Sequence, residues 1–233
     1  MKSRLSSSNN SIEVPRLSLF ILPKIYYYPW ILIVLMRYKL VYHSLRGINM
    51  RGLMILADGF EDTEALTTRD VLIRAGFEVT TCSITDRLEV ESSFGIHILA
   101  DALLKLMFDL EPYDFIILPG GGRGTRNLKE CEFLKAYLDY FALHNKLICA
   151  ICAAPSILGY YGYLDNKKFT CFAGFNVGIP GDFTGKEVER DGNIITARSM
   201  KYSIPFALEI IDYLVGPEVK EKVLEGLCGL TAK

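Results

Sequence analysis

A cysteine lies where a short apolar run ends and small residues begin a helix. Cys152 follows the apolar residues 147–151 and precedes Ala153, Ala154 and Pro155. A turn of this kind, a nucleophile elbow, lifts one side chain out of a buried sheet edge. It points that side chain at the N-terminus of the next helix, where unpaired N–H groups and the helix dipole favour a thiolate. The spacing therefore predicts nucleophilic chemistry at Cys152.

Two other interpretations of this segment stay open. Cys149 and Cys152 form a C-x-x-C, which in an α/β protein can be a redox dithiol. If residues 147–151 are a strand, however, the two sulfurs diverge, because Cys149 points to one face and Cys152 to the other face or into the turn. A single cysteine is also commonly a buried structural residue that packs as a small hydrophobe. The small residues after Cys152 favour the elbow over both alternatives.

The elements that would position Cys152 alternate between strands and helices. Apolar or alternating runs predict strands over residues 52–57, 77–84, 113–118 and 147–151, with a hairpin-like pair around Val90 and residues 96–99. Helices are predicted over residues 61–74, about 127–144, 204–215 and 217–227. This order is typical of an α/β fold with a doubly wound, mostly parallel sheet and helices on both faces. Such folds bind ligands at the carboxyl ends of their strands.

Three predicted strand ends meet at one edge of this sheet. The first carries Glu61 and Glu64, the second carries residues 120–122, and the third carries Cys152. Acidic residues at a helix start ordinarily only complement the helix dipole. The glycines lack the Lys-Ser/Thr of a P-loop, and the sequence has no G-x-G-x-x-G, so nucleotide binding is not expected. They would instead let backbone N–H groups approach an oxyanion beside the thiol.

Length and charge restrict the possible functions. The 233 residues allow one α/β domain with a full core and some extra chain. With 26 basic and 27 acidic residues the net charge is −1, so no overall field would recruit nucleic acid or an anionic membrane. The six cysteines are few for this length, and several lie in apolar runs. This pattern suits reduced thiols, and a cytoplasmic location is expected.

The N-terminal segment, residues 1–49, differs from the rest of the sequence. Residues 17–36 are nearly all apolar or aromatic, but Pro23, Lys24 and Pro29 interrupt them. A membrane-spanning helix needs about 20 predominantly apolar residues, and no small-residue cleavage site of a signal peptide follows. We therefore predict an N-terminal extension that is disordered, a targeting or membrane-tethering leader, or a non-functional extension. As a leader, it would place the protein in an organelle or at a membrane.

Three segments resemble those of a known family. Residues 56–64 (LADGFEDTE), 118–122 (LPGGG) and 150–155 (AICAAP) are similar, in order and spacing, to the signature segments of the DJ-1/PfpI (ThiJ/PfpI) superfamily, and most of all to its DJ-1/YajL-like branch. Because the resemblance runs from about Met50 to the C-terminus, residues 50–233 are predicted as one domain. It implies a flavodoxin-like, dimeric protein. Members of this branch are described as glutathione-independent glyoxalases, protein deglycases, chaperones and oxidative-stress sensors.

The resemblance also implies roles for individual residues. Cys152 would be the nucleophilic and oxidisable thiol, and Glu64 the carboxyl that hydrogen-bonds it. Gly121 and Ala153 would supply backbone oxyanion donors, and neither a metal nor an organic cofactor is expected. The predicted site residues are Cys152, Glu64, Gly121, Ala153, Gly120 and, in a secondary role, Glu61.

The sequence departs from the family at several positions. Proteases of the PfpI type carry a histidine directly after the cysteine, whereas this chain has Ala153, so a protease is not expected. Phe172 stands near where some DJ-1-like members place a histidine. Residues 199–203 replace a small Gly-Pro-Gly-Thr turn that is common in relatives. The bulkier Met200 and Tyr202 would narrow the pocket or alter the dimer surface.

These features predict a cysteine-dependent glyoxalase or deglycase. The Cys152 thiolate would add to a small α-oxoaldehyde such as methylglyoxal, or act on a glycated thiol or amine, and Glu64 would move a proton between adjacent carbons. Methylglyoxal would become lactate without glutathione. The alternative is a redox-sensing chaperone of the oxidative-stress response, in which Cys152 is oxidised to a sulfinate that Glu64 stabilises. A biosynthetic role attached to the ThiJ name is weaker, because no phosphate or cofactor site is visible.

The other predicted partner is a second copy of the chain. Apolar residues at helical spacing over residues 204–215 and 217–227, together with the resemblance, suggest a homodimer. Nucleic acid is not expected, and membrane contact is expected only through the N-terminal extension, if at all.

Overall fold

The structure, a computed structural model, describes residues 50–230. The predictions made for residues 1–49 lie outside the described residues, as do residues 231–233. Within the described range, no helix is both long enough and apolar enough to cross a membrane.

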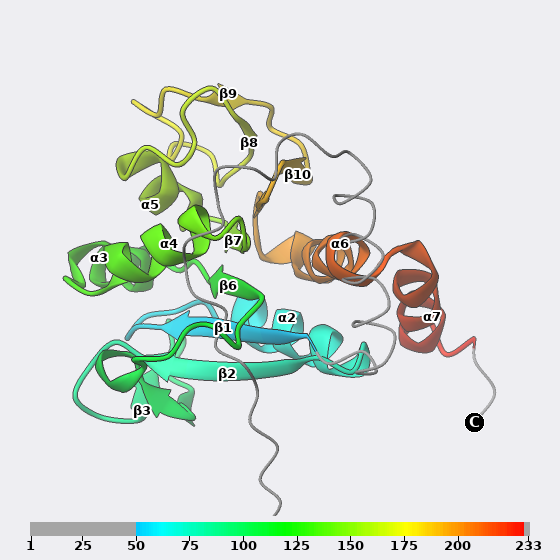
Figure 1. Cartoon of the computed structure of the whole chain (residues 1–233), viewed down its shortest axis with the longest axis horizontal. Helices are drawn as coiled ribbons and strands as arrows, with labels where there is room; N and C mark the ends of the chain where they lie inside the picture. Colours follow the sequence, from blue (N-terminus) through cyan, green and yellow to red (C-terminus); the bar gives the residue numbers. More distant parts are fainter. Residues whose placement is uncertain (1–49, 231–233) are drawn as a thin grey trace, which may run out of the picture. The chain divides into compact units, whose positions relative to one another are not determined.

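A seven-stranded sheet forms the centre of the described region (Figure 1). Its strands are β1 (Arg51–Leu56), β2 (Glu78–Ser83), β5 (Ala102–Leu103), β6 (Phe115–Leu118), β7 (Leu147–Ile151), β10 (Val188–Asp191) and β11 (Ile194–Ala197). They lie in the order β10-β11-β7-β6-β1-β2-β5, and every neighbouring pair is parallel except β10 and β11. The predicted α/β fold with a mostly parallel sheet is therefore confirmed.

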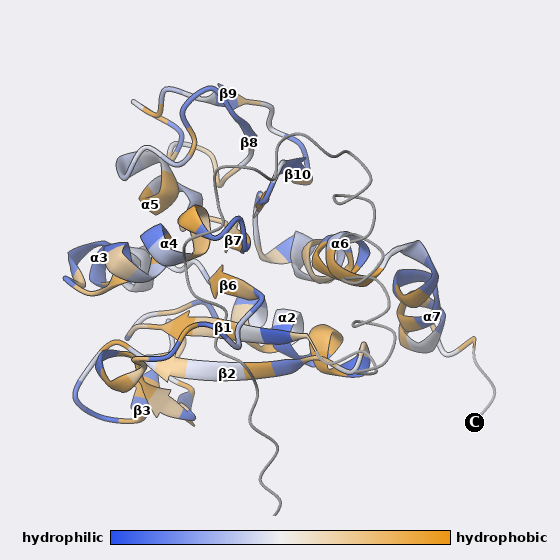
Figure 2. Ribbon diagram, viewed as in Figure 1, coloured by the Kyte–Doolittle hydropathy of each residue, from blue (hydrophilic) through white to orange (hydrophobic). Residues whose placement is uncertain are grey.

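The three central strands are apolar along their length because both of their faces are covered. β6 and β7 are buried at every position, and β1 at every position after Arg51. Alternate residues of β1 face opposite layers: Leu53 and Ile55 pack in one apolar cluster, and Met54 and Leu56 pack in the other. Figure 2 shows hydrophobic colours on β1 and β6.

Helices cover both faces of the sheet. One layer contains α2 (Asp62–Arg74) and α6 (Ser203–Val215), with α7 (Pro217–Leu227) packed beside α6. The other layer contains α3 (Gly122–Glu130), α4 (Leu134–Leu143) and α5 (Pro155–Tyr160). Figure 1 shows the latter three helices grouped together, apart from α6 and α7.

Short elements connect these layers. β3 (Glu89–Glu91) pairs antiparallel with β4 (His97–Leu99), which confirms the predicted hairpin. β8 (Lys168–Phe169) pairs with β9 (Asp182–Phe183), and two 3₁₀ turns span Leu104–Leu106 and Met200–Tyr202. The loop between β3 and β4 and the turn at Met200 both reach the candidate site described below.

The single helix predicted over residues 127–144 is wrong. The structure has two helices there, α3 and α4, because Cys131 is extended (φ −69°, ψ 112°) and ends α3. α3 begins as early as Gly122 because Gly121, with φ 92°, turns the chain after β6. Gly124 then packs so closely on the loop after β1 that a Cβ would lie 2.7 Å from the Gly59 carbonyl oxygen. These contacts join distant segments, and helical periodicity does not reveal them.

The two C-terminal helices are present as predicted, but their apolar residues have another use. α6 buries Phe206, Ile210 and Ile211 in the core of its own chain. α7 buries Val223 at the edge of the same cluster. The apolar spacing of α6 is therefore explained by core packing, and it gives no indication of a dimer.

Candidate active site

The carboxyl ends of β1, β6, β7 and β11, four neighbouring strands, meet at one edge of the sheet. The chain passes from β1 to β2 on one side and returns to β6 on the other side of β1, so this edge is a topological switch point. Glu64 follows β1, residues 120–122 follow β6, Cys152 follows β7, and Met200 follows β11. The predicted convergence of three strand ends is therefore confirmed, and a fourth strand joins them.

Cys152 occupies a strained turn directly after β7. Its φ is 63°, a left-handed value that is uncommon for a residue with a Cβ. The Cys152 N–H donates to the Ala197 carbonyl oxygen at 2.8 Å, and the Cys152 carbonyl oxygen accepts from the Phe172 N–H at 2.7 Å. These two bonds hold the backbone on both sides, so the half-buried thiol has the elbow geometry that the sequence predicted.

Glu64 lies in the first turn of α2 and is almost fully buried, with 1% of its surface exposed. Its Oε2 accepts a hydrogen bond from the Gly120 N–H at 2.8 Å. Its Oε1 is buried without a well-formed hydrogen bond among the described residues. The Cys152 thiol is close enough to interact with this carboxyl and to lower its pKa. A proton on the carboxyl would satisfy the buried oxygen, because it can then donate toward sulfur.

Glu61 acts as the cap of the same helix. Its Oε2 accepts a hydrogen bond from the Glu64 N–H at 2.7 Å, which fixes the first turn of α2. Partial burial raises the pKa of Glu61. The Glu61 N–H in turn donates to the Gly120 carbonyl oxygen at 3.1 Å. Glu61 thereby ties the loop after β1 to the loop after β6 and positions Glu64.

The Glu64 and Cys152 side chains form a coupled pair. Burial raises the pKa of Glu64 to about 7, against the lowering effects of the thiol and of the Gly120 N–H. Burial also raises the pKa of Cys152, and the Glu64 carboxylate adds to this increase, whereas the Ala153 and Gly121 N–H groups lower it. Two negative charges in this buried space repel each other, so the pair retains at least one proton near neutral pH.

The sequence predicted that unpaired N–H groups and a helix dipole favour a thiolate at Cys152, and burial opposes this. Burial is the largest influence on the pKa of Cys152, and it disfavours the charge. The groups that favour a thiolate are the Ala153 and Gly121 N–H groups, which lie before α5 begins at Pro155. A negative sulfur therefore depends on these two donors and on a proton resting on Glu64.

Gly120 and Gly121 are required by close contacts. A Cβ on Gly120 would lie 2.6 Å from Glu64 Oε2 and 2.8 Å from the Cys152 Cβ. Gly121 has φ 92°, and a Cβ there would lie 2.3 Å from the Gly59 carbonyl oxygen. The Gly120 N–H is engaged by Glu64, whereas the Gly121 N–H faces the sulfur. Gly120 therefore differs from its predicted place among the oxyanion donors, because it holds the carboxyl.

Cys149 is not placed to form a dithiol with Cys152. It is fully buried within β7, where it pairs with Ile117 of β6 and Ile195 of β11. Burial raises the pKa of Cys149 well above that of an ordinary thiol, and both cysteines are free. The geometry favours the elbow interpretation over the C-x-x-C interpretation.

A cavity of about 310 Å³, here called the thiol pocket, opens at Cys152. The predicted site residues that line it are Glu61, Glu64, Gly121, Cys152 and Ala153. Phe172 and Met200, two of the departures from the family pattern, also line it. Tyr202 does not, because its side chain is buried and its hydroxyl accepts a hydrogen bond from Arg198.

Three residues of this wall were not predicted from the sequence. Ser93 and Phe94 come from the loop between β3 and β4, and Phe175 follows Phe172. One signal was available: Phe94 lies in the small polar turn Ser92-Ser93-Phe94-Gly95, where a large aromatic residue is unusual. Nothing local indicated that this turn lies beside Cys152.

Within residues 50–230, no group of three or more His, Cys, Asp or Glu side chains could hold a metal ion. The His97 Nδ1 lies 3.3 Å from the Glu89 Oε1 across the β3–β4 hairpin. His144 ends α4, where its Nδ1 is 2.8 Å from the Tyr140 carbonyl oxygen. Neither histidine lines the thiol pocket.

The chain is similar to known proteins over most of its length. The profile of the DJ-1/PfpI family matches residues 50–213. Parkinson disease protein 7 homolog of Danio rerio is 36% identical over 177 residues, which cover 74% of this chain and 94% of the relative. The crystal structure of Drosophila melanogaster DJ-1beta superposes with a TM-score of 0.73 at 32% identity, covering 80% of this chain and 100% of the fly chain.

Two further relatives bear on function and length. The glutathione-independent glyoxalase DJR-1.2 of Caenorhabditis elegans is 29% identical over 170 residues, which cover 72% of this chain and 90% of the relative. Protein DJ-1 homolog B of Arabidopsis thaliana is 36% identical over 185 residues, which cover 78% of this chain. The chain spans only 41% of the length of that plant relative.

Proposed function

Because the chain belongs to the DJ-1/PfpI family, we propose that it is a cysteine-dependent glyoxalase that converts α-oxoaldehydes to 2-hydroxy acids without glutathione. The same chemistry extends to the adducts that these aldehydes form with thiols and amines. The observation that carries the proposal is the buried Glu64 carboxyl, with a pKa raised to about 7, beside the Cys152 thiol. The nematode relative named as a glutathione-independent glyoxalase adds support.

The first step uses a proton that the Glu64 and Cys152 side chains retain. The Cys152 sulfur bonds to the aldehyde carbon, the carbon–oxygen π bond breaks, and the new oxygen takes the proton to give a hemithioacetal. The Gly121 and Ala153 N–H groups, which already face the sulfur, are placed to stabilise the developing alkoxide. Glu64 serves as the proton source, because burial lets it hold a proton near neutral pH.

The next steps move one proton and add one water. Glu64, once ionised, removes the proton from the former aldehyde carbon and returns it to the neighbouring carbon through an enediol. The product is the thioester of a 2-hydroxy acid, and water then releases the acid and restores the thiol. Oxidation of one carbon balances reduction of the other, so no external oxidant is needed. A pKa of about 7 suits Glu64 to both giving and taking this proton.

A direct assay tests the proposal. Purified full-length protein is incubated with methylglyoxal without glutathione, and lactate is measured over time. Steady lactate formation that is lost in Cys152→Ser and retained in Cys149→Ser is expected. The absence of lactate from the wild-type protein would rule out methylglyoxal as a substrate, and the absence of turnover of every α-oxoaldehyde tested would rule the proposal out.

A redox-sensing role is the second candidate. The observation that favours it is that Cys152 is a free, half-buried thiol facing the pocket, beside a carboxyl able to donate a hydrogen bond. Peroxide would oxidise the thiol to a sulfinate, and a protonated Glu64 would bind a sulfinate oxygen. The glyoxalase mechanism requires Glu64 to exchange protons, whereas sulfinate binding requires only a hydrogen-bond donor.

We also propose that the protein forms a homodimer through α2 and β4. Leu66 and Ile73 are exposed on the same face of α2, at 41% and 42%, and Leu99 of β4 is 75% exposed. Between α2 and β4 lies a cavity of about 230 Å³, here called the α2–β4 pocket, whose wall includes Leu66, Arg69 and Leu99. An exposed apolar patch of this kind is typical of a protein interface.

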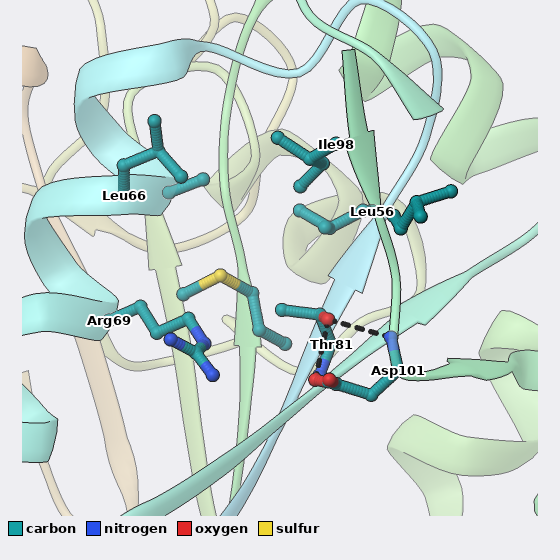
Figure 3. Close-up of a pocket in the computed structure, with 9 residues that line it drawn as sticks. Leu56, Leu66, Arg69, Thr81, Ile98 and Asp101 are labelled. Atoms are coloured by element: carbon teal, nitrogen blue, oxygen red, sulfur yellow. Dashed lines mark hydrogen bonds between the residues drawn. The ribbon is translucent and has the colours of Figure 1, made fainter. Parts of the chain in front are cut away.

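The polar groups of the α2–β4 pocket are consistent with the proposed homodimer. Figure 3 shows Arg69 reaching toward the pocket from α2, opposite Thr81 and Asp101. Asp101 is occupied, because it accepts hydrogen bonds from the Thr81 N–H at 2.8 Å and the Thr81 hydroxyl at 2.7 Å. The Arg69 Nε is buried and has no partner among the described residues. A second copy of the chain packed on α2 would cover the leucines and bring acceptors to this guanidinium.

A further inference from the structure

The wall of the thiol pocket is unusual in its composition. It carries three phenylalanines and a methionine, Phe94, Phe172, Phe175 and Met200, and its inner surface is overwhelmingly apolar. These side chains are partly exposed in the described structure, at 80%, 47%, 37% and 49% respectively. Large apolar groups left open around a reactive thiol are available to contact a substrate.

The aromatic residues are held in place by the same contacts that build the site. The Phe172 N–H donates to the Cys152 carbonyl oxygen at 2.7 Å, so its backbone is held beside the elbow. The Phe172 and Phe175 rings pack edge to face, with centroids 6.4 Å apart and planes at 71°. An aromatic group entering the pocket can continue this edge-to-face arrangement.

The loop that carries Phe94 is also tied to the site. The Ser93 N–H donates to the Phe60 carbonyl oxygen at 2.7 Å, and the Ser93 hydroxyl donates to the Gly59 carbonyl oxygen at 2.7 Å. Both acceptors lie in the loop between β1 and α2, which leads to Glu64. These bonds hold the backbone next to Phe94 at the pocket, and its largely exposed ring forms part of the pocket wall.

The charges around the pocket restrict the substrate further. The ionisable side chains that line it, besides the thiol, are the carboxyls of Glu61 and Glu64, and its described lining contains no lysine, arginine or histidine. An anionic substrate such as a keto acid or a phosphorylated aldehyde would meet repulsion without a balancing cation. The pocket therefore suits an uncharged molecule with an apolar substituent.

We propose that the preferred substrates are uncharged α-oxoaldehydes with an aryl or bulky apolar substituent, and that methylglyoxal is a minor one. The inference rests on the proposed function for the chemistry at Cys152. A methyl group leaves most of a 310 Å³ cavity unfilled, whereas a phenyl ring contacts Phe172, Phe175 and Phe94 and removes apolar surface from water. The reaction is otherwise the same: an arylglyoxal and water give an aryl 2-hydroxy acid.

The first test compares turnover of phenylglyoxal and methylglyoxal by the full-length protein. We expect kcat/KM for phenylglyoxal to be at least about tenfold higher, the lower end of what one apolar contact contributes to selectivity. Phe172→Ala should reduce this preference by at least about threefold, mainly through a higher KM for phenylglyoxal. Equal or lower kcat/KM for phenylglyoxal would overturn the inference and leave the glyoxalase proposal intact.

The second test does not depend on turnover. Cys152 is alkylated with 2-bromoacetophenone or bromoacetone: in each case a carbon–sulfur bond forms, bromide leaves, and the thiol proton goes to solvent. Labelling of the peptide that contains Cys152 is followed by mass spectrometry, and each rate is divided by the rate with N-acetylcysteine. We expect the corrected rate for the phenyl reagent to be at least about tenfold higher. A corrected ratio of one or less would contradict the apolar pocket.

Matched variants distinguish the contribution of the pocket wall from the nonspecific effects of replacing a phenylalanine. Phe94→Ala and Phe172→Ala should each lower the phenyl preference in both tests. Phe108→Ala provides the control, because Phe108 is 86% exposed and does not line the pocket. A phenyl preference in alkylation without turnover of either aldehyde would support the apolar pocket and reject the glyoxalase proposal. A preference unchanged in both pocket variants would overturn the inference.

Discussion

Two cavities lie beside α2, and they are built in opposite ways. At the N-terminal end of the helix, the thiol pocket has buried polar groups that meet at one sulfur: Glu64, with Oε2 bound by Gly120, and the N–H groups of Gly121 and Ala153. Along the exposed face of the same helix, the α2–β4 pocket has open leucines and an Arg69 Nε without a described partner. Glu64 and Leu66 are two positions apart on α2 and belong to different pockets.

The difference shows how one helix can serve two purposes. In the thiol pocket, burial changes the protonation of a carboxyl, and this is useful for chemistry on a small molecule. In the α2–β4 pocket, burial of the apolar surface is incomplete, and a second protein surface would complete it. Substitutions in the first pocket should therefore change catalysis, and those in the second should change assembly.

The largest effect is expected from Cys152→Ser. A serine hydroxyl is a far weaker nucleophile than a thiolate, so methylglyoxal turnover should fall more than about a thousandfold. Cys149→Ser, a substitution of the same kind in the buried middle of β7, should leave turnover within a few-fold of wild type. Lactate formation by the three proteins provides the measurement. Comparable losses in both variants would support the dithiol interpretation instead.

Glu64→Gln should have the next largest effect. Glutamine keeps the shape and can donate a hydrogen bond, but it cannot accept a proton from the substrate, so turnover should fall by about 10² to 10⁴. Sulfinate formation with peroxide should be affected less, because an amide still donates to a sulfinate oxygen. Both rates are measured on one preparation. Near-normal turnover would eliminate the catalytic role proposed for this carboxyl.

The same variant should change how stability depends on pH. The pKa of Glu64 is raised in the folded protein from 4.5 to about 7, so its contribution to stability is complete below pH 4.5 and is lost as the pH rises through 7. Between those limits the wild-type protein should lose up to about 3 kcal/mol of unfolding free energy relative to Glu64→Gln. Urea unfolding of both proteins from about pH 4.5 to pH 8 measures this difference. Parallel curves would show that burial does not raise this pKa.

The smallest effect is expected in the α2–β4 pocket. Leu66→Glu places a charge in the proposed interface and should raise the dimer dissociation constant at least about tenfold. Leu143→Glu is the control, because Leu143 is 82% exposed at the end of α4, in the helix layer on the opposite face of the sheet. Light scattering over a range of protein concentrations gives the dimer dissociation constant of the wild-type protein and of each variant. A monomeric wild-type protein would contradict the dimer proposal outright.

Much of the fold could be predicted because its signals are local. The runs that became β1, β6 and β7 are continuously apolar, since strands buried on both faces need no polar residues. The start of α3 at Gly122 could not be predicted in this way. It depends on the packing of Gly124 against Gly59, which belongs to the loop after β1.

Some residues of the candidate site could likewise be predicted from the sequence, and others could not. Cys152 lies in a segment whose residue types indicate chemistry by themselves, whereas Glu64 was predicted from the resemblance to the family. Phe94 and Phe175 were missed, because an aromatic residue in a loop has no local signature that distinguishes a pocket wall from an exposed surface. Phe172 was noted only as a departure from the family pattern.

The sequence by itself determined the alternation of strands and helices and the position of the elbow, because both depend on residues close together in the chain, and its resemblance to the family pointed to the thiol and the carboxyl. Only the tertiary structure decided that Glu64 has a pKa raised to about 7, that Gly120 holds its Oε2, and that an aromatic wall surrounds the sulfur. The physical reason is that pKa values, hydrogen bonds and pocket shape depend on which distant segments are buried together, and burial is a property of the packed chain.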